Sequence, residues 1–333
     1  MRLVNVLALT NAKLINDPFV SNFTNLAVEA KAIKRGNLFI AFDETTIEEA
    51  ILNGAYGIIF DKPTQISDTE IAWIKVKNIE EALKKLLRFK LIENNIVSYS
   101  CDDVTLKLAL QIYSEQKLLI IDGTLKSIAQ ILWNIESKSI TLFSSTLKDK
   151  DIFTDVKTIE QSKIRYIQIR EQTLFETSFI YDNKYYEREF ITPLFIEKLN
   201  NLIHLYKIYK IDFRFKRFFP LENFEAIFIN KKFEIKDFGS TERVLIFEKN
   251  IEYLSSEIEF LQKNSSWART IYILPSSCRL KNEEDSNIYR YKNSKEIIQI
   301  LKKDSFNFAF IFGKDKKILQ KQIITQTQLT LDF

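Results

Sequence analysis

Apolar residues along this 333-residue chain recur at two spacings, one typical of buried strands and the other of amphipathic helices. The first part is predicted to hold strands and helices in the order strand 37–42, helix 47–53, strand 56–60, strand 71–76 and helix 79–89. Gly54 follows the first of these helices, as glycine commonly does where a helix ends. This alternation predicts an α/β fold.

The alternation continues to the end of the chain. The middle is predicted to hold helix 103–114, strand 117–121, helix 128–135, strands 140–143 and 166–169, hairpin 177–181/185–190 and helix 197–209. The last part is predicted to hold strands 243–247, 270–274 and 308–312, helices 251–262 and 294–303, and a further element over 318–323. We therefore predict three parts: a small α/β domain over 1–115, a shortened central segment over 116–212, and a Rossmann-like domain over 213–333.

The amino-acid composition argues against some classes of function but does not identify one. The chain is 46% hydrophobic and 28% charged, which is ordinary for a globular protein. The net charge of +4 comes from interspersed Lys and Glu, so nucleic-acid binding is not predicted. Six glycines leave few places for a phosphate-binding loop. Cys101 and Cys278 are expected to be free thiols, with no metal spacing, and without a leader or an apolar span the expected location is the cytoplasm.

The stretch over 32–89 carries a family resemblance. Its segments AIKRGNLFIAF, TIEEAILNGAYGIIFDK and IAWIKVKNIEEALKKLLRF are similar in order and spacing to the UDP-sugar-binding domain of the bacterial Mur ligases, with the late-acting muropeptide ligases as the nearest relatives. The resemblance implies a fold with a small N-terminal α/β domain, a central ATP-binding domain and a Rossmann-like C-terminal domain. It also implies ATP-dependent amide-bond formation on a UDP-muramoyl peptide of peptidoglycan synthesis.

The UDP-sugar residues that the resemblance implies are altered here. The family's Asp-Ser/Thr-Arg triplet corresponds to Glu29, Ala30 and Lys31, ahead of a turn that contains Asn37. Lysine cannot make the two-pronged contact of an arginine. Glu29, Lys31 and Asn37 are therefore candidates for a modified UDP-sugar site, and a solvated connection is the structural alternative.

The family's phosphate loop also has a changed counterpart. Gly123, Thr124, Lys126 and Ser127 follow a predicted strand and precede a helix, which is the layout of such a loop, but the segment is one residue shorter and lacks the second glycine. Lys126 and Ser127 could meet a phosphate of ATP at the helix N-terminus. The alternative is a vestigial turn.

Other family residues have weak counterparts. The carboxylates that could hold Mg²⁺ near Ser127 are Asp149, Asp151 and Asp155, which lie in a charged segment expected to be solvated. His204, the one histidine, has apolar neighbours and is expected to be packed rather than catalytic. Only Glu248 remains of the acidic segment that follows the first strand of the family's C-terminal domain.

The last six residues form a separate motif. Gln328, Leu331 and Phe333 are similar in spacing to the short peptide by which bacterial replication and repair proteins bind the sliding clamp. In that reading, an exposed tail places a leucine and an aromatic ring in an apolar pocket. A C-terminal strand is the alternative.

These observations favour a degenerate Mur-ligase homologue, a pseudoenzyme with a binding or scaffolding role that touches a UDP-muramoyl peptide or a cell-wall protein. The first alternative is an active ligase that uses ATP and Mg²⁺, and the second is an interaction protein tethered to the sliding clamp. No catalytic residue is assigned by the sequence.

Overall fold

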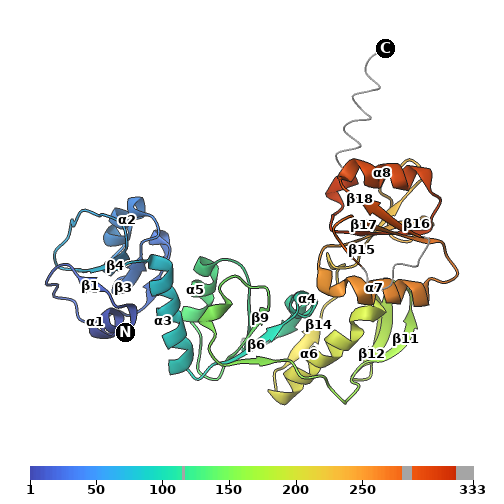
Figure 1. Ribbon diagram of the computed structural model, residues 1–333. Coiled ribbons are helices and arrows are strands. Elements are labelled where there is room, and N and C mark those ends of the chain that lie inside the picture. The colour runs from blue at the N-terminus through green and yellow to red at the C-terminus, as the bar shows by residue number, and fades with distance from the viewer. Residues whose placement is uncertain (115–116, 280–286, 320–333) are drawn as a thin grey trace, which may run out of the picture. The chain divides into compact units, whose positions relative to one another are not determined.

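The structure, a computed structural model, describes residues 1–114, 117–279 and 287–319 (Figure 1). The predicted clamp-binding residues Gln328, Leu331 and Phe333 lie outside these ranges. The chain divides into two compact units. Unit 1 comprises Met1–Gln161 and Leu205–Arg214, and unit 2 comprises Ser162–His204 and the chain from Phe215 onward.

Unit 1 begins with a five-stranded sheet in the order β1-β5-β4-β3-β2. Its strands are β1 (Lys13–Leu14), β2 (Leu26–Ala27), β3 (Asn37–Ile40), β4 (Ala55–Phe60) and β5 (Ala72–Lys75), and all pairs are parallel except β1 with β5. Alternate residues of β4 point to opposite faces. Ile58 packs in one core beside α2 (Ile47–Leu52), while Ile59 packs in the other with α1 (Leu3–Thr10) and α3 (Ile79–Glu93). Burial on both faces explains why these strands are nearly all apolar.

A second sheet in unit 1 has the order β10-β6-β9-β8, with every pair parallel. Its strands are β6 (Val97–Cys101), β8 (Leu118–Ile121), β9 (Ile140–Ser144) and β10 (Val156–Thr158). Helices α4 (Asp103–Gln111) and α5 (Leu125–Trp133) connect them, and η3 (Lys150–Ile152) precedes β10. This second sheet is called the central sheet below. Its first strand, β6, pairs with β9 and β10 but lies inside the predicted domain 1–115.

Two element boundaries differ from the sequence pattern. The predicted helix 103–114 ends at Gln111, and Ile112–Ser114 forms β7. Isoleucine and tyrosine favour the extended conformation, which accounts for the early end. Helix α5 begins three residues before the predicted start at 128, because the Thr124 side chain caps it at the backbone N–H of Ser127.

The segment Leu205–Arg214 belongs to unit 1, although it follows the first segment of unit 2 in the sequence. Tyr206 is fully buried, the hydroxyl groups of Tyr209 and Tyr99 lie 2.9 Å apart, and the Arg214 guanidinium lies 4.6 Å from the centre of the Tyr113 ring. Helix α6 (Ile196–Ile208) therefore starts in unit 2 and ends in unit 1.

Unit 2 contains two sheets. One is the antiparallel set β11 (Gln168–Gln172), β12 (Thr177–Tyr181) and β13 (Lys184–Glu189), followed by η4 (Pro193–Phe195). The other has the order β15-β16-β19-β17-β18. Its strands are β15 (Glu225–Ile229), β16 (Arg243–Glu248), β17 (Thr270–Pro275), β18 (Ile288–Tyr291) and β19 (Phe308–Phe312), joined in part by α7 (Ile251–Asn264) and α8 (Ser294–Lys303). The short strand β14 (Phe213–Phe215) lies at the division between the units.

The parallel core of β16, β19, β17 and β18 with intervening helices confirms the α/β prediction for the last part of the chain. Its strands are mostly apolar, and Leu245, Ile271 and Ile311 belong to one buried cluster. Among the described residues, no helix is long and apolar enough to cross a membrane.

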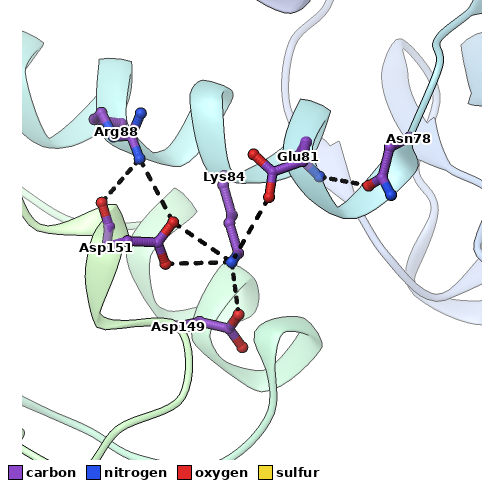
Figure 2. Close-up of polar contacts among 6 residues, drawn as sticks. All are labelled: Asn78, Glu81, Lys84, Arg88, Asp149 and Asp151. Atoms are coloured by element: carbon purple, nitrogen blue, oxygen red, sulfur yellow. Dashed lines mark hydrogen bonds and ion pairs between the residues drawn. The ribbon is translucent and has the colours of Figure 1, made fainter.

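Helix α3 holds the two sheets of unit 1 together. It contacts both α1 and α5, and its Leu83, Leu86 and Leu87 are fully buried in the core that the two sheets share. Figure 2 shows its polar side, where the Lys84 ammonium lies 2.9 Å from Asp149 and 3.2 Å from Asp151. The Asp149 side chain is only 8% exposed, so this ion pair is largely removed from water.

Arg88 extends the same cluster. One of its terminal nitrogens donates a 2.8 Å hydrogen bond to the Asp151 carbonyl and lies 3.8 Å from the Asp151 carboxylate (Figure 2). The hydrogen bond to Asp149 raises the pKa of Lys84. Lys84 thus joins α3 to η3 as a cation in the neutral pH range.

We predict that Lys84→Met lowers the free energy of unfolding by about 2 kcal/mol, because it leaves the buried Asp149 carboxylate without its partner. Urea denaturation measures the change. Lys62→Met is the matched control, since Lys62 pairs with Glu44 at 3.2 Å on an exposed surface and should change stability little. Equal effects of the two substitutions would contradict the assignment.

Candidate functional site

The carboxyl edge of the central sheet is the first candidate site. In a parallel sheet, the loops that follow the strands gather at one edge, where ligands of α/β proteins usually bind. The loops after β6, β8 and β9 meet this condition, and the predicted phosphate-binding residues Gly123, Thr124, Lys126 and Ser127 lie after β8 and at the start of α5.

Several hydrogen-bonding groups of this turn bond to one another. The Asp122 carboxylate accepts the Gly123 N–H at 2.7 Å, and the Thr124 hydroxyl caps α5 at the Ser127 N–H. The Ser127 hydroxyl donates to the Thr124 carbonyl at 2.8 Å. A Cβ on Gly123 would lie 2.8 Å from the Ser127 hydroxyl oxygen, so the turn is closed over itself. A phosphate-binding loop instead needs its backbone N–H groups aimed outward at the anion.

Lys126 is directed away from such an anion. Its ammonium lies 4.7 Å from the centre of the Phe42 ring, which is a cation–π contact with the end of the first sheet. Asp122 adds a negative charge where a phosphate would need a positive one. In this conformation the residues do not fit the triphosphate of ATP, and no catalytic step through ATP is derived.

The same edge carries polar residues that the sequence pattern did not single out. The Asp102 carboxylate caps α4 at the Thr105 N–H. The hydroxyl groups of Ser144 and Thr146 both donate to the Asp103 carboxylate, which links the loops after β6 and β9. The signal was present in the sequence, since two aspartates directly follow the strand that opens the central sheet.

The predicted UDP-sugar residues separate into two environments. Glu29 and Lys31 are exposed and lie at one short turn, η1 (Ala30–Ala32), with Glu29 as its N-cap residue. Asn37 is buried at the start of β3, where its side-chain oxygen accepts a hydrogen bond from Thr24 at 3.2 Å. The structure therefore brings Glu29 and Lys31 together at the surface and places Asn37 in the interior.

The predicted solvation of the acidic segment 149–155 is corrected in part. Asp149 is buried against Lys84 and Asp151 shares that cation, while Asp155 is exposed. The reason is a lysine on α3, 65 residues away in sequence, which pattern analysis does not connect to the segment. Within the described ranges, no group of three or more His, Cys, Asp and Glu side chains has the arrangement of a metal site.

His204 lies in unit 2, near the end of its part of α6. Its Nδ1 is 2.9 Å from the Tyr166 hydroxyl, and the two rings are 5.9 Å apart. This contact agrees with the interpretation of His204 as a packed residue.

The carboxyl edge of the unit 2 sheet is the second candidate site. Glu248 ends β16 and is 1% exposed. Its carboxylate accepts the backbone N–H groups of Lys249 at 2.7 Å, Asn250 at 2.6 Å and Phe224 at 3.2 Å. The acid that matches the family position is thus a structural anchor for the loop that leads into α7.

A second buried acid, Glu257 on α7, lies beside Glu248 and is fully buried. Burial raises the pKa of Glu257 to about 11, and the neighbouring charge of Glu248 adds to the increase. Glu257 therefore keeps its proton at neutral pH. The sequence pattern does not single out Glu257, since glutamate is seldom buried.

We predict that stability falls as pH rises above about 4.5, because the folded chain retains a Glu257 proton that the unfolded chain releases. One such proton contributes a slope of up to about 1.4 kcal/mol per pH unit. Glu257→Gln should reduce this slope, so its stability advantage over the unaltered chain should grow from pH 5 to pH 9. Thermal unfolding across this range tests it, with the exposed Glu259→Gln on the same helix as control. Parallel profiles for all three proteins would refute the assignment.

Comparisons by sequence identify no relative. No protein-family model matches the chain, and no curated protein sequence matches it either.

Comparison with solved structures identifies a similar fold. A crystal structure of MurF from Acinetobacter baumannii aligns over 98% of this chain and 98% of its own, with a TM-score of 0.51 and 8% sequence identity. MurF ligase from Thermotoga maritima in complex with ADP aligns over 90% of this chain and 96% of its own, with a TM-score of 0.48 and 11% identity. The A. baumannii alignment shows that the chain has a Mur-ligase-like α/β fold, as the sequence pattern predicts.

Proposed function

We propose that this chain is a Mur-ligase homologue that has lost ligase chemistry and keeps a binding or scaffolding role in peptidoglycan precursor metabolism. The observation that carries the proposal is the closed turn Asp122–Ser127. The Gly123 and Ser127 N–H groups and the Thr124 and Ser127 hydroxyl groups form hydrogen bonds within the turn, and the Lys126 ammonium contacts the Phe42 ring. A ligase of this fold needs an open loop for the phosphates of ATP.

Two further observations support the loss of chemistry. Asp149 and Asp151 neutralise Lys84 and Arg88, so their charge serves the packing of unit 1. The Glu248 carboxylate accepts hydrogen bonds from backbone N–H groups. Buried polar groups that satisfy one another are stable where they lie, and opening them for a ligand would cost free energy.

We predict that titration calorimetry with Mg²⁺ and ATP gives no heat of binding at millimolar ATP. The reason is that binding would require the turn to open and Lys126 to leave Phe42. Lys126→Ala and the exposed Lys85→Ala serve as test and control variants. Micromolar binding that Lys126→Ala abolishes and Lys85→Ala preserves would overturn the proposal and favour the active ligase.

The retained partner in this proposal is a UDP-muramoyl peptide that contacts the turn of Glu29 and Lys31. We predict that UDP-N-acetylmuramoyl tripeptide binds in the absence of ATP and that Lys31→Ala weakens the binding by about tenfold, because the diphosphate loses a charged hydrogen-bond donor. Calorimetry with the Lys85→Ala control measures this. Binding that is insensitive to Lys31 would exclude this turn, and absence of binding would leave the scaffolding role to a protein partner.

A further inference from the structure

Unit 2 contains a cavity away from the carboxyl edge of its five-stranded sheet. The cavity has a volume of about 460 Å³ and lies at the amino ends of β16 and β19. Four aromatic side chains line it: Phe175, Phe228, Trp267 and Phe308. Cavities of this size hold small organic molecules.

The rings meet at steep angles. Trp267 and Phe308 are 5.8 Å apart with an angle of 83° between their planes, and Phe175 meets Phe228 at 6.1 Å and 78°. Phe175 also meets Phe308 at 6.2 Å and 64°. Walls set edge to face in this way form the corners of an aromatic box.

The chain holds three of these rings firmly and leaves the fourth open. Phe175 lies in the tight turn between β11 and β12, where the Thr173 hydroxyl accepts the N–H groups of Phe175 and Glu176. Phe228 and Phe308 are buried in sheet strands. Trp267 is 75% exposed, which is unusual for so large an apolar side chain and leaves its surface available to a ligand.

The charge carried by the described lining residues is negative. Of the described residues that line it, Glu242 is acidic and none is Lys or Arg. The neighbouring guanidinium groups are engaged elsewhere. Arg243 packs 4.3 Å from the centre of the Phe306 ring, and Arg269 faces Asp304 and Ser305.

We propose that this aromatic cavity binds a small organic ammonium ion. The ring faces carry negative electrostatic potential and attract a cation that is poorly hydrated, and tryptophan is the strongest such partner. The Glu242 carboxylate supplies the complementary charge at the rim. The Glu242 carboxylate would repel an anionic ligand, and a neutral apolar ligand would gain nothing from it.

This inference does not depend on the proposed function. The cavity is built from the amino ends of two strands and the β11–β12 turn, whereas the candidate sites lie at carboxyl edges. Its failure would therefore leave the Mur-ligase proposal untouched.

The test uses acetylcholine as a probe and 3,3-dimethylbutyl acetate as its neutral counterpart of the same shape. Calorimetry with the full chain should show acetylcholine binding about tenfold more tightly than the neutral ester. Trp267→Ala should weaken acetylcholine binding by about tenfold, whereas Trp267→Phe should retain part of it. Glu242→Gln should weaken it severalfold, and the exposed Glu259→Gln should leave it unchanged.

Trp267 and Glu242 are exposed, so these substitutions should not prevent folding, and circular dichroism of each variant verifies this. Equal binding of acetylcholine and the neutral ester would overturn the proposal, because the cavity would then be merely apolar. Absence of binding at millimolar acetylcholine, or binding unaffected by both Trp267→Ala and Glu242→Gln, would overturn it as well.

Discussion

Unit 1 depends on the burial of α3 between two sheets. The apolar side of this helix packs against α1 on the first sheet and α5 on the second, so a single hydrophobic core serves both sheets. On the inner side of this helix the Lys84 side chain is only 13% exposed, and its charge must be neutralised. Asp149 and Asp151 provide the neutralising charge, and the loop before β10 is fixed as a result.

At both candidate sites, polar groups of the protein form hydrogen bonds with one another. At the edge of the central sheet, Asp122, Thr124 and Ser127 satisfy their own turn, and Asp103 joins two loops through the hydroxyl groups of Ser144 and Thr146. At the edge of the unit 2 sheet, Glu248 accepts backbone N–H groups that would otherwise be buried without a partner. Positions where α/β enzymes hold ligands are here occupied by the chain's own polar groups.

Much of the fold could be predicted from the sequence, because local periodicity determines elements such as β4, α3 and β19. Strands β3, β4 and β5 of the first sheet and β16, β17 and β19 of unit 2 were predicted to within two residues at each end, whereas β1, β2 and β18 were not predicted. The pairing of those elements could not be predicted, since β6 reads like the end of the first domain and only its ladders with β9 and β10 assign it to the second sheet. The partners of Asp149 and Glu257 were missed for the same reason, as both contacts form between segments that no local pattern connects.

The division of the chain has a consequence for how the protein is made. The segment with the buried Tyr206 belongs to unit 1, but residues 162–204 of unit 2 precede it in the chain. A ribosome therefore completes the sequence of unit 1 only after it has made residues 162–204, the first segment of unit 2. Synthesis of the two units is interleaved, so a shortened chain that ends near residue 161 would lack the tyrosine that pairs with Tyr99.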